Sequence, residues 1–136
     1  MQPVSVGIVM RDGHILACQR KRTARYPLKW EFPGGKVEPK ESPWDAIVRE
    51  LHEELGITAD SGEEFHRQEW TYPESAIDRK QNGSFRVFYF LIREFSGEPR
   101  NQAFEEIRWV RPQELPGMDV LEGNREAINL LLKHAV

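Results

Sequence analysis

The sequence predicts an α/β fold, a sandwich of helices around a mixed β-sheet, in one domain covering residues 1–136. Short segments rich in β-branched and aromatic residues are interleaved with two amphipathic helical patterns, which is typical of layered α/β folds. A chain of 136 residues with 39% hydrophobic and 30% charged residues is long enough to bury a core and has the composition of a soluble globular protein.

The composition also argues against several classes of protein. The net charge of −3 provides no general basic face, so we expect no binding to duplex nucleic acid. We expect no contact with membranes, because no apolar run reaches the roughly 18–20 residues of a membrane span and the N-terminus lacks a signal-peptide pattern. The single cysteine, Cys18, excludes an internal disulfide framework and a multi-cysteine zinc site. These features predict a cytoplasmic protein.

Strand patterns precede the first helix. Residues 4–10 are rich in β-branched side chains, Asp12-Gly13 is a hairpin signal, and residues 14–20 form the second strand candidate. After a polar loop, residues 30–32 make a short strand that we expect the following Pro-Gly-Gly to stop.

The best-defined element is a helix over residues 43–55. Ser42 can cap its N-terminus, Pro43 suits the first helical position, and Gly56 supplies the C-terminal stop. One face is apolar at helical spacing, formed by Trp44, Ile47, Val48, Leu51 and Leu55.

The second half of the chain predicts three strands, a helical turn and a closing helix. The strands are expected at residues 65–72, 85–93 and 106–110, the turn at 112–115 and the helix at 126–133. The segment 73–84, between the first two of these strands, is polar and is predicted to be a loop.

Three carboxylates form an acidic ridge on the predicted helix: Glu50, Glu53 and Glu54. At 100° per residue, Glu54 lies about 40° to one side of Glu50 and Glu53 about 60° to the other, beside the apolar face. Like charges one turn apart weaken a helix, yet together they are the hard oxygen ligands that Mg²⁺ or Mn²⁺ prefers. A Glu-Glu pair alone is usually a solvated face, but metal binding is the economical interpretation of the whole ridge.

Neighbouring residues extend this candidate metal site. Arg49 precedes Glu53 by one turn and can hold its carboxylate in place. Gly34 and Gly35 permit backbone geometries that could bring a carbonyl to the metal. Glu41 ends the same loop, immediately before the helix cap.

The spacing over residues 35–57 resembles the signature of the Nudix hydrolases at every specified position: Gly35, Glu41 and the string RELHEELGI at residues 49–57. The preceding WEFPGGK, residues 30–36, resembles the MutT-like branch, and we extend the resemblance over residues 1–136. The resemblance implies an α/β/α sandwich and cleavage of a nucleoside diphosphate linked to another group, with Mg²⁺ as cofactor and Mn²⁺ as a possible substitute.

Carried over by motif position, the resemblance implies that Glu50, Glu53 and Glu54 are metal ligands together with the Gly34 carbonyl. Arg49 would orient a carboxylate. Metal ions suit this chemistry because they neutralise phosphate oxygens and lower the pKa of the attacking water.

The resemblance also implies a general base and a phosphate contact. The base would be Glu50 or Glu41, since family members differ on this point, and Lys36 would meet phosphate. A carboxylate that removes a proton from the attacking water contributes on the order of 10²–10⁴ in rate.

Candidate substrate-binding residues follow from the same resemblance. Asn124 matches the place where MutT-like enzymes read a base edge, although it can equally cap the helix that begins at Arg125. Asp119 is a second candidate in this segment. Arg20 matches a substrate-contacting arginine or ends its strand in solvent, and Phe32 can stack on a base or belong to the core.

One position departs from the family pattern. Many relatives carry an acidic residue where this chain has Ala103, and the nearest carboxylates are Glu105 and Glu106. Either a neighbour substitutes or the metal shell is smaller. Some relatives that resemble RNA pyrophosphohydrolases lack that acid too, and Arg79 and Lys80 in the polar loop could serve a longer substrate or merely be exposed.

The leading hypothesis is Mg²⁺-dependent hydrolysis of a (deoxy)nucleoside triphosphate to monophosphate and pyrophosphate, with oxidised guanine nucleotides such as 8-oxo-dGTP as the first substrate to test. Alternatives are a pyrimidine nucleoside triphosphate pyrophosphohydrolase and an RNA 5′-pyrophosphohydrolase. A non-catalytic nucleotide-binding module is disfavoured because Arg49 and the acidic ridge are intact. We expect a nucleotide as the binding partner and a monomer or homodimer.

Overall fold

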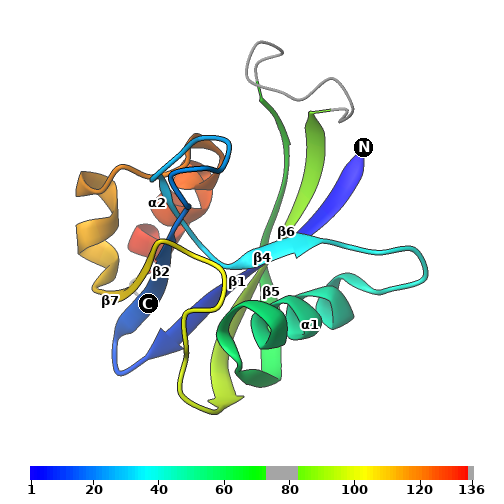
Figure 1. The fold of residues 1–136 in the computed structure, drawn as a ribbon, viewed down its shortest axis with the longest axis horizontal. Helices are drawn as coiled ribbons and strands as arrows, with labels where there is room; N and C mark the ends of the chain where they lie inside the picture. The colour runs from blue at the N-terminus through cyan, green and yellow to red at the C-terminus, as the bar shows by residue number, and fades with distance from the viewer. Residues whose placement is uncertain (73–82, 135–136) are drawn as a thin grey trace.

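The computed structural model describes residues 1–72 and 83–134, so the suggestion about Arg79 and Lys80 lies outside the described residues. The elements in chain order are β1 (Gln2–Arg11), β2 (His14–Gln19), β3 (Trp30–Glu31), β4 (Gly34–Lys36), α1 (Pro43–Leu55), β5 (Thr58–Thr71), β6 (Ser84–Ser96), β7 (Glu106–Val110), the 3₁₀ turns η2 (Pro112–Gly117) and η3 (Glu122–Asn124), and α2 (Arg125–Lys133) (Figure 1). Within these ranges neither α-helix has the length and apolar character that crossing a bilayer requires.

The sheet is mixed, as predicted. Its central path runs β3-β2-β1-β6-β5, with β4 paired to β1 and β7 paired to β2. β1 and β6 are parallel over eight residue pairs, from Gln2 opposite Phe85 to Val9 opposite Ile92, whereas the other strand pairs are antiparallel.

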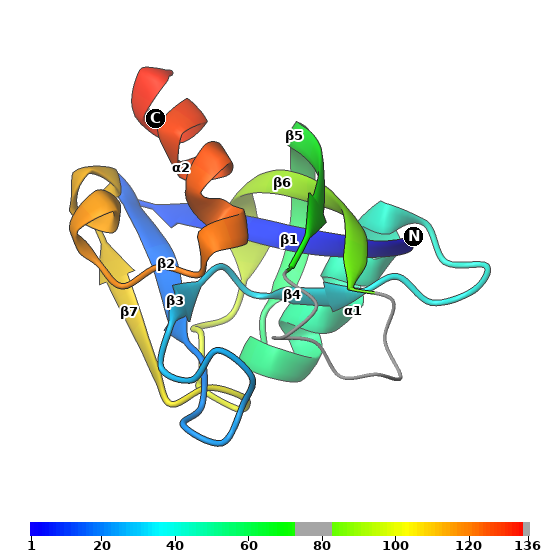
Figure 2. The same ribbon diagram turned by 90° about the horizontal axis from the view of Figure 1, so that it is seen from above.

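Side chains alternate across this sheet and divide the core into two clusters. Along β1, Ile8 packs on one face and Val9 on the other, and both are completely buried. Helix α2 covers the Ile8 face and α1 covers the Val9 face, so the helices lie on opposite sides of β1 (Figure 2). The expected α/β/α sandwich is therefore confirmed.

Helix α1 begins and ends where its local signals predict. The Ser42 side chain accepts a hydrogen bond from the Asp45 backbone N–H at 3.0 Å, and Gly56 adopts the left-handed conformation with φ of 68°. The helix buries Ala46, Ile47, Leu51 and Leu55 against the sheet. This packing leaves the acidic ridge alongside β4.

Two strands differ from the prediction. Strand β3 ends at Glu31, before the Pro-Gly-Gly segment as predicted, but Gly34 and Gly35 then form a further strand, β4, which pairs with Val6 and Ser5 of β1. A side chain on Gly34 would collide with the Ser5 carbonyl oxygen, so this close pairing requires glycine.

Strand β5 begins at Thr58 rather than at residue 65. Its first half carries repeated register irregularities against β6, between Ala59 and His66. Each irregularity shifts the side-chain alternation, so the period of two that reveals a strand in a sequence is absent there.

Candidate active site

A pocket of about 280 Å³ opens on the α2 face of the sheet, next to β4. Val4, Val6, Phe85 and Val87 supply apolar lining from the adjacent strands β1 and β6. Its volume is near the lower end of the range for small-molecule sites, and its lining combines apolar surface with a few polar groups.

Three charged residues line the pocket, and two of them, Arg20 and Glu31, contact each other. Arg20 does not end its strand in solvent: its guanidinium donates to Glu31 Oε1 at 3.1 Å and to the Arg25 carbonyl at 2.7 Å. Burial raises the pKa of Glu31 despite the neighbouring arginine. Glu31 is not among the residues predicted from the sequence, although a charged residue between Trp30 and Phe32 in an otherwise apolar strand is a signal that could have identified it.

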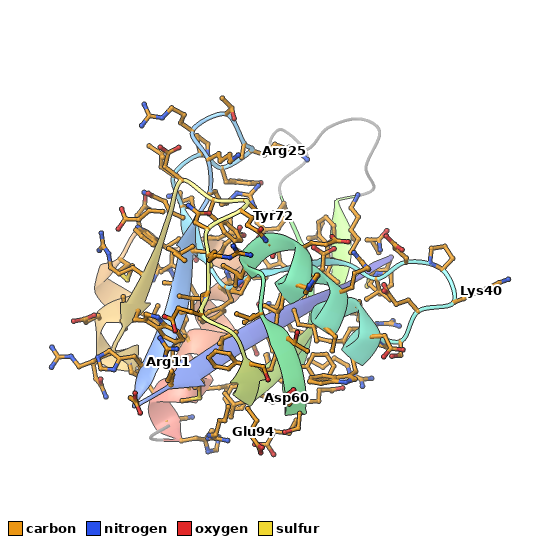
Figure 3. The ribbon with its side chains drawn as sticks, turned by 60° about the horizontal axis from the view of Figure 1, so that its bottom comes forward. Arg11, Arg25, Lys40, Asp60, Tyr72 and Glu94 are labelled. Carbon is orange, nitrogen blue, oxygen red and sulfur yellow. The ribbon has the colours of Figure 1, made fainter. Side chains whose placement is uncertain are left out.

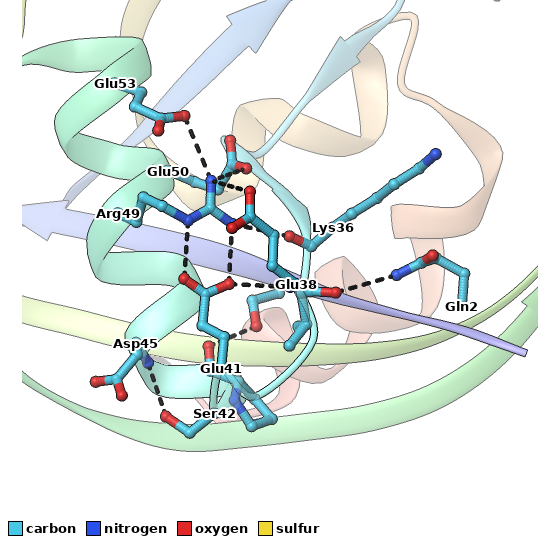
Figure 4. A network of polar contacts seen from close by, with 12 residues as sticks. Gln2, Lys36, Glu38, Glu41, Ser42, Asp45, Arg49, Glu50 and Glu53 are labelled. Atoms are coloured by element: carbon cyan, nitrogen blue, oxygen red, sulfur yellow. Dashed lines mark hydrogen bonds and ion pairs between the residues drawn. The ribbon is translucent and has the colours of Figure 1, made fainter.

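The remaining predicted substrate residues separate into two groups. Phe32 and Asn124 both line the pocket, and Phe32 also belongs to the core cluster under α2. Asp119 is outside the pocket lining and pairs with Lys29 at 2.6 Å, with 66% of its side chain exposed. Lys36 is exposed, and its side chain points away from the polar network around α1 (Figure 4).

The prediction that the Asn124 side chain caps α2 is wrong. Asn124 occupies the cap position of α2 but makes no side-chain capping bond. Its Oδ1 instead accepts a hydrogen bond from the Tyr89 hydroxyl at 3.0 Å, and only 6% of Asn124 is exposed. Its side chain is therefore part of the pocket wall.

Arg49 organises the carboxylates beside β4 (Figure 4). Two of its nitrogens donate to the two oxygens of Glu41, at 2.8 and 3.0 Å, and a third donates to Glu50 at 2.8 Å. The predicted contact with Glu53 is present but longer, at 3.4 Å. The forked bond from Arg49 is the main cause that lowers the pKa of Glu41 to about 2.

Glu50 and Glu54 lie against the glycines of β4. Glu54 Oε1 accepts a hydrogen bond from the Gly34 N–H at 3.0 Å. A Cβ at Gly35 would come within 2.6 Å of the Glu50 carboxylate, so the absence of a side chain there makes room for it. Burial, followed by repulsion from Glu50, raises the pKa of Glu54 to about 8, and burial also raises the pKa of Glu50.

The chain matches one family model over nearly its whole length. The NUDIX domain model covers residues 1–131. The chain belongs to the Nudix family. It is a MutT-like Nudix hydrolase, an enzyme of the class that acts on diphosphate bonds of nucleotides.

Individual relatives are similar over most of their length. An 8-oxo-dGTP diphosphatase of Haemophilus influenzae is 35% identical over 130 residues, which cover 95% of this chain and 90% of the relative. A CTP pyrophosphohydrolase of Escherichia coli is 36% identical over 114 residues, covering 84% and 78% respectively. The crystal structure of a MutT Nudix hydrolase from Burkholderia pseudomallei superposes with a TM-score of 0.80 at 28% identity, covering 96% of this chain and 97% of that one.

Nudix hydrolases generally require a divalent cation, and the donor set beside β4 fits such an ion. Glu50 and Glu54 supply partly desolvated carboxylate oxygens, and none of the ion pairs among the described residues involves Glu54. Glu53 is turned outward with 58% of its side chain exposed. Accordingly, no three acidic, histidine or cysteine side chains converge on one point within residues 1–72 and 83–134.

The carboxylates near Ala103 are committed elsewhere. Glu105 pairs with Arg22 at 3.4 Å, and Glu106 pairs with Arg108 at 2.8 Å. Neither glutamate lines the pocket. These contacts favour the smaller metal shell over substitution by a neighbouring acid.

Proposed function

We propose that this Nudix hydrolase cleaves (deoxy)nucleoside triphosphates to monophosphate and pyrophosphate with Mg²⁺, and that 8-oxo-dGTP is the first substrate to test. The observation that carries the proposal is a pocket of about 280 Å³ in which Glu54 forms part of the wall. A nucleoside held there would have its phosphates beside the acidic ridge. The 35% identity to the Haemophilus influenzae 8-oxo-dGTP diphosphatase supports the same substrate class.

In this proposal Glu50 and Glu54 hold the cation, and Glu53 turns inward from its exposed position to join them. The Gly34 carbonyl remains the proposed fourth donor. When bound, the cation neutralises phosphate oxygens and lowers the pKa of the attacking water.

Hydrogen bonding favours Glu50 over Glu41 as the general base. Both oxygens of Glu41 accept from Arg49, and one also accepts from the Glu38 N–H at 3.0 Å. Glu50 accepts from Arg49 through Oε1 alone, and Oε2 has no hydrogen bond from another residue within 1–72 and 83–134. A base needs such an uncommitted oxygen within reach of the water. Arg49 thus acts by holding Glu41 and Glu50 in place.

The nucleoside would be bound by the pocket walls. Phe32 and Phe85 offer aromatic surface, Arg20 offers a cation, and Asn124 offers a polar amide. Lys36 remains a proposed phosphate contact from its exposed position, whereas Asp119 is not proposed to touch the substrate because it lies outside the pocket lining. A cytoplasmic location and a monomeric or homodimeric state stay predictions.

The test is a product screen of the purified protein with Mg²⁺. The panel contains 8-oxo-dGTP, dGTP, CTP, dUTP and a 5′-triphosphorylated RNA, and the expected products from the first are 8-oxo-dGMP and pyrophosphate. Glu54→Gln should reduce turnover by at least about 10² if that carboxylate holds the ion, whereas His52→Gln, an exposed change on the same helix, should not.

Each alternative has its own result in the same screen. Preference for CTP would follow the 36%-identical Escherichia coli relative. A triphosphorylated RNA that outcompetes free nucleotides would favour the RNA 5′-end activity. Nucleotide binding without any phosphate product would overturn the proposal in favour of a binding module.

A further inference from the structure

A chain of buried polar groups behind the pocket ends on Asn124. The Tyr89 hydroxyl lies 3.0 Å from Asn124 Oδ1 and 3.1 Å from the Gly123 carbonyl oxygen. The same Gly123 oxygen accepts from Gln68 Nε2 at 2.8 Å. Gln68, Tyr89 and Asn124 are all less than 9% exposed, so each of their polar atoms needs a partner.

The single hydroxyl proton of Tyr89 has two acceptors within reach. The Gly123 oxygen already receives the shorter bond from Gln68, whereas Asn124 Oδ1 has no donor other than Tyr89 in the described part of the chain. An unsatisfied buried acceptor is costly, so the proton belongs on the Asn124 side. Burial also raises the pKa of Tyr89, so the hydroxyl keeps that proton at neutral pH.

This bond determines what Asn124 offers to a ligand. Asn124 lines the pocket, and its Oδ1 is engaged by Tyr89. Its amide nitrogen makes no hydrogen bond to another described residue. The amide therefore presents N–H donors, and not its oxygen, to a bound nucleobase.

We propose that Tyr89 is a positioning residue that fixes the Asn124 amide with its N–H groups toward the pocket, so that the site selects nucleobases with a keto oxygen. This inference rests on the proposed nucleotide substrate. Guanine, hypoxanthine, uracil and thymine present a keto acceptor at the relevant edge, whereas adenine and cytosine present an amino donor there. An amino group facing the Asn124 N–H groups leaves both sides unpaired.

The backbone around Asn124 is held independently of the Tyr89 hydroxyl. The Asn124 N–H donates to the Leu121 carbonyl at 3.0 Å, and Gln68 retains its own bond to Gly123. A side chain on Gly123 would come within 2.6 Å of the Tyr72 hydroxyl, so this loop is closely packed. Removing the Tyr89 hydroxyl thus frees the amide to rotate while the loop stays in place.

The test compares substrates that differ at the keto or amino position. The substrate pairs are dITP with dATP and dUTP with dCTP, and kcat/KM is measured for each. We expect the wild type to favour the keto member at least about tenfold. Tyr89→Phe should bring the ratio of kcat/KM between the two members of each pair close to one, because the freed amide can turn its oxygen toward an amino base.

A second variant keeps the inference falsifiable if Tyr89→Phe does not fold. In Asn124→Asp, Tyr89 still donates to one oxygen and the other faces the pocket as an acceptor, so the preference should reverse toward dATP and dCTP. Tyr26→Phe is the matched control, because the Tyr26 hydroxyl has no hydrogen-bond partner within the described ranges. It should leave the ratio unchanged.

Calorimetric binding of dIMP and dAMP in the absence of metal provides a readout independent of turnover, and should show the same preference and the same changes. If no nucleoside triphosphate is hydrolysed and neither monophosphate binds, the proposed function itself fails. If nucleotides are bound but the wild type favours amino bases, or if Tyr89→Phe leaves the keto preference intact, only the inference about Tyr89 is overturned.

Discussion

Replacing Glu54 with glutamine is expected to abolish activity and yet to stabilise the metal-free protein at alkaline pH. Burial and the neighbouring Glu50 raise the pKa of Glu54 to about 8 from its ordinary value of 4.5. Between these two pH values the unfolded chain loses a proton that the folded protein keeps. The free energy of unfolding of the wild type therefore falls as pH rises through this window.

The magnitude follows from the size of the shift. Each pKa unit corresponds to about 1.4 kcal/mol, so the raised pKa of Glu54 lowers the unfolding free energy of the metal-free protein by at most about 3 kcal/mol at pH 7 and by at most about 5 kcal/mol above pH 8. Glutamine has nearly the same volume and keeps an oxygen that can accept from the Gly34 N–H. It carries no charge to desolvate, so most of this cost disappears in the variant.

Urea unfolding in a chelator, from pH 5 to pH 9, measures the effect. Wild type and Glu54→Gln should be nearly equally stable at pH 5, and the variant should be more stable by several kcal/mol at pH 8.5. Glu53→Gln is the control, because its carboxylate is 58% exposed. Added Mg²⁺ should stabilise the wild type and not Glu54→Gln. Parallel pH profiles for wild type and Glu54→Gln would show that the pKa of Glu54 is not raised in the folded protein.

Three further outcomes are expected. Gly35→Ala places a Cβ 2.6 Å from the Glu50 carboxylate and should lower kcat by at least about tenfold. Gly117→Ala is the control, because an added Cβ there meets nothing within 4 Å, and equal kcat values for the two variants would contradict the role of Gly35. A lysine in Arg49→Lys cannot donate to both oxygens of Glu41 as the guanidinium does. NMR titration should therefore show the Glu41 pKa rising from about 2 toward its ordinary value, and an unchanged pKa would disprove that Arg49 lowers it. Ser42→Ala removes the cap of α1 and should lower the unfolding free energy by about 1 kcal/mol with kcat unchanged. A loss of activity without a loss of stability would contradict the assignment of Ser42 to a structural role alone.

Local signals explain which elements the sequence predicts well. Helix α1 has its cap at Ser42, its stop at Gly56 and a continuous apolar face, all within one short segment. Strand β4 exists only because β1 lies beside it, and two glycines carry no strand signal of their own. The irregular first half of β5 similarly depends on its pairing with β6.

The same distinction separates the two parts of the candidate site. The acidic ridge is predicted from the sequence because helical geometry alone places Glu50, Glu53 and Glu54 at neighbouring positions of α1, although Glu53 is turned outward in the structure. The pocket joins Glu31, Tyr89 and Asn124 from distant parts of the chain, so their proximity depends on the whole fold. Nothing in the local sequence of β6 indicates that the Tyr89 hydroxyl would meet Asn124.

Gly34 and Gly35 of β4 lie where the acidic ridge meets the pocket. Helix α1 packs across one face of the sheet (Figure 3). The apolar pocket residues on β1 and β6 belong to the core cluster on the other face. Glu54 lines the pocket together with Gly34 and Gly35, and the lack of a side chain at Gly35 makes room for the Glu50 carboxylate next to it. Under the proposed function, we therefore expect chemistry and base selection on different faces of the sheet, which meet beside Gly34 and Gly35. Changes at Tyr89 or Asn124 should consequently alter which base is accepted, while the hydrogen bonds of Arg49 remain as they are.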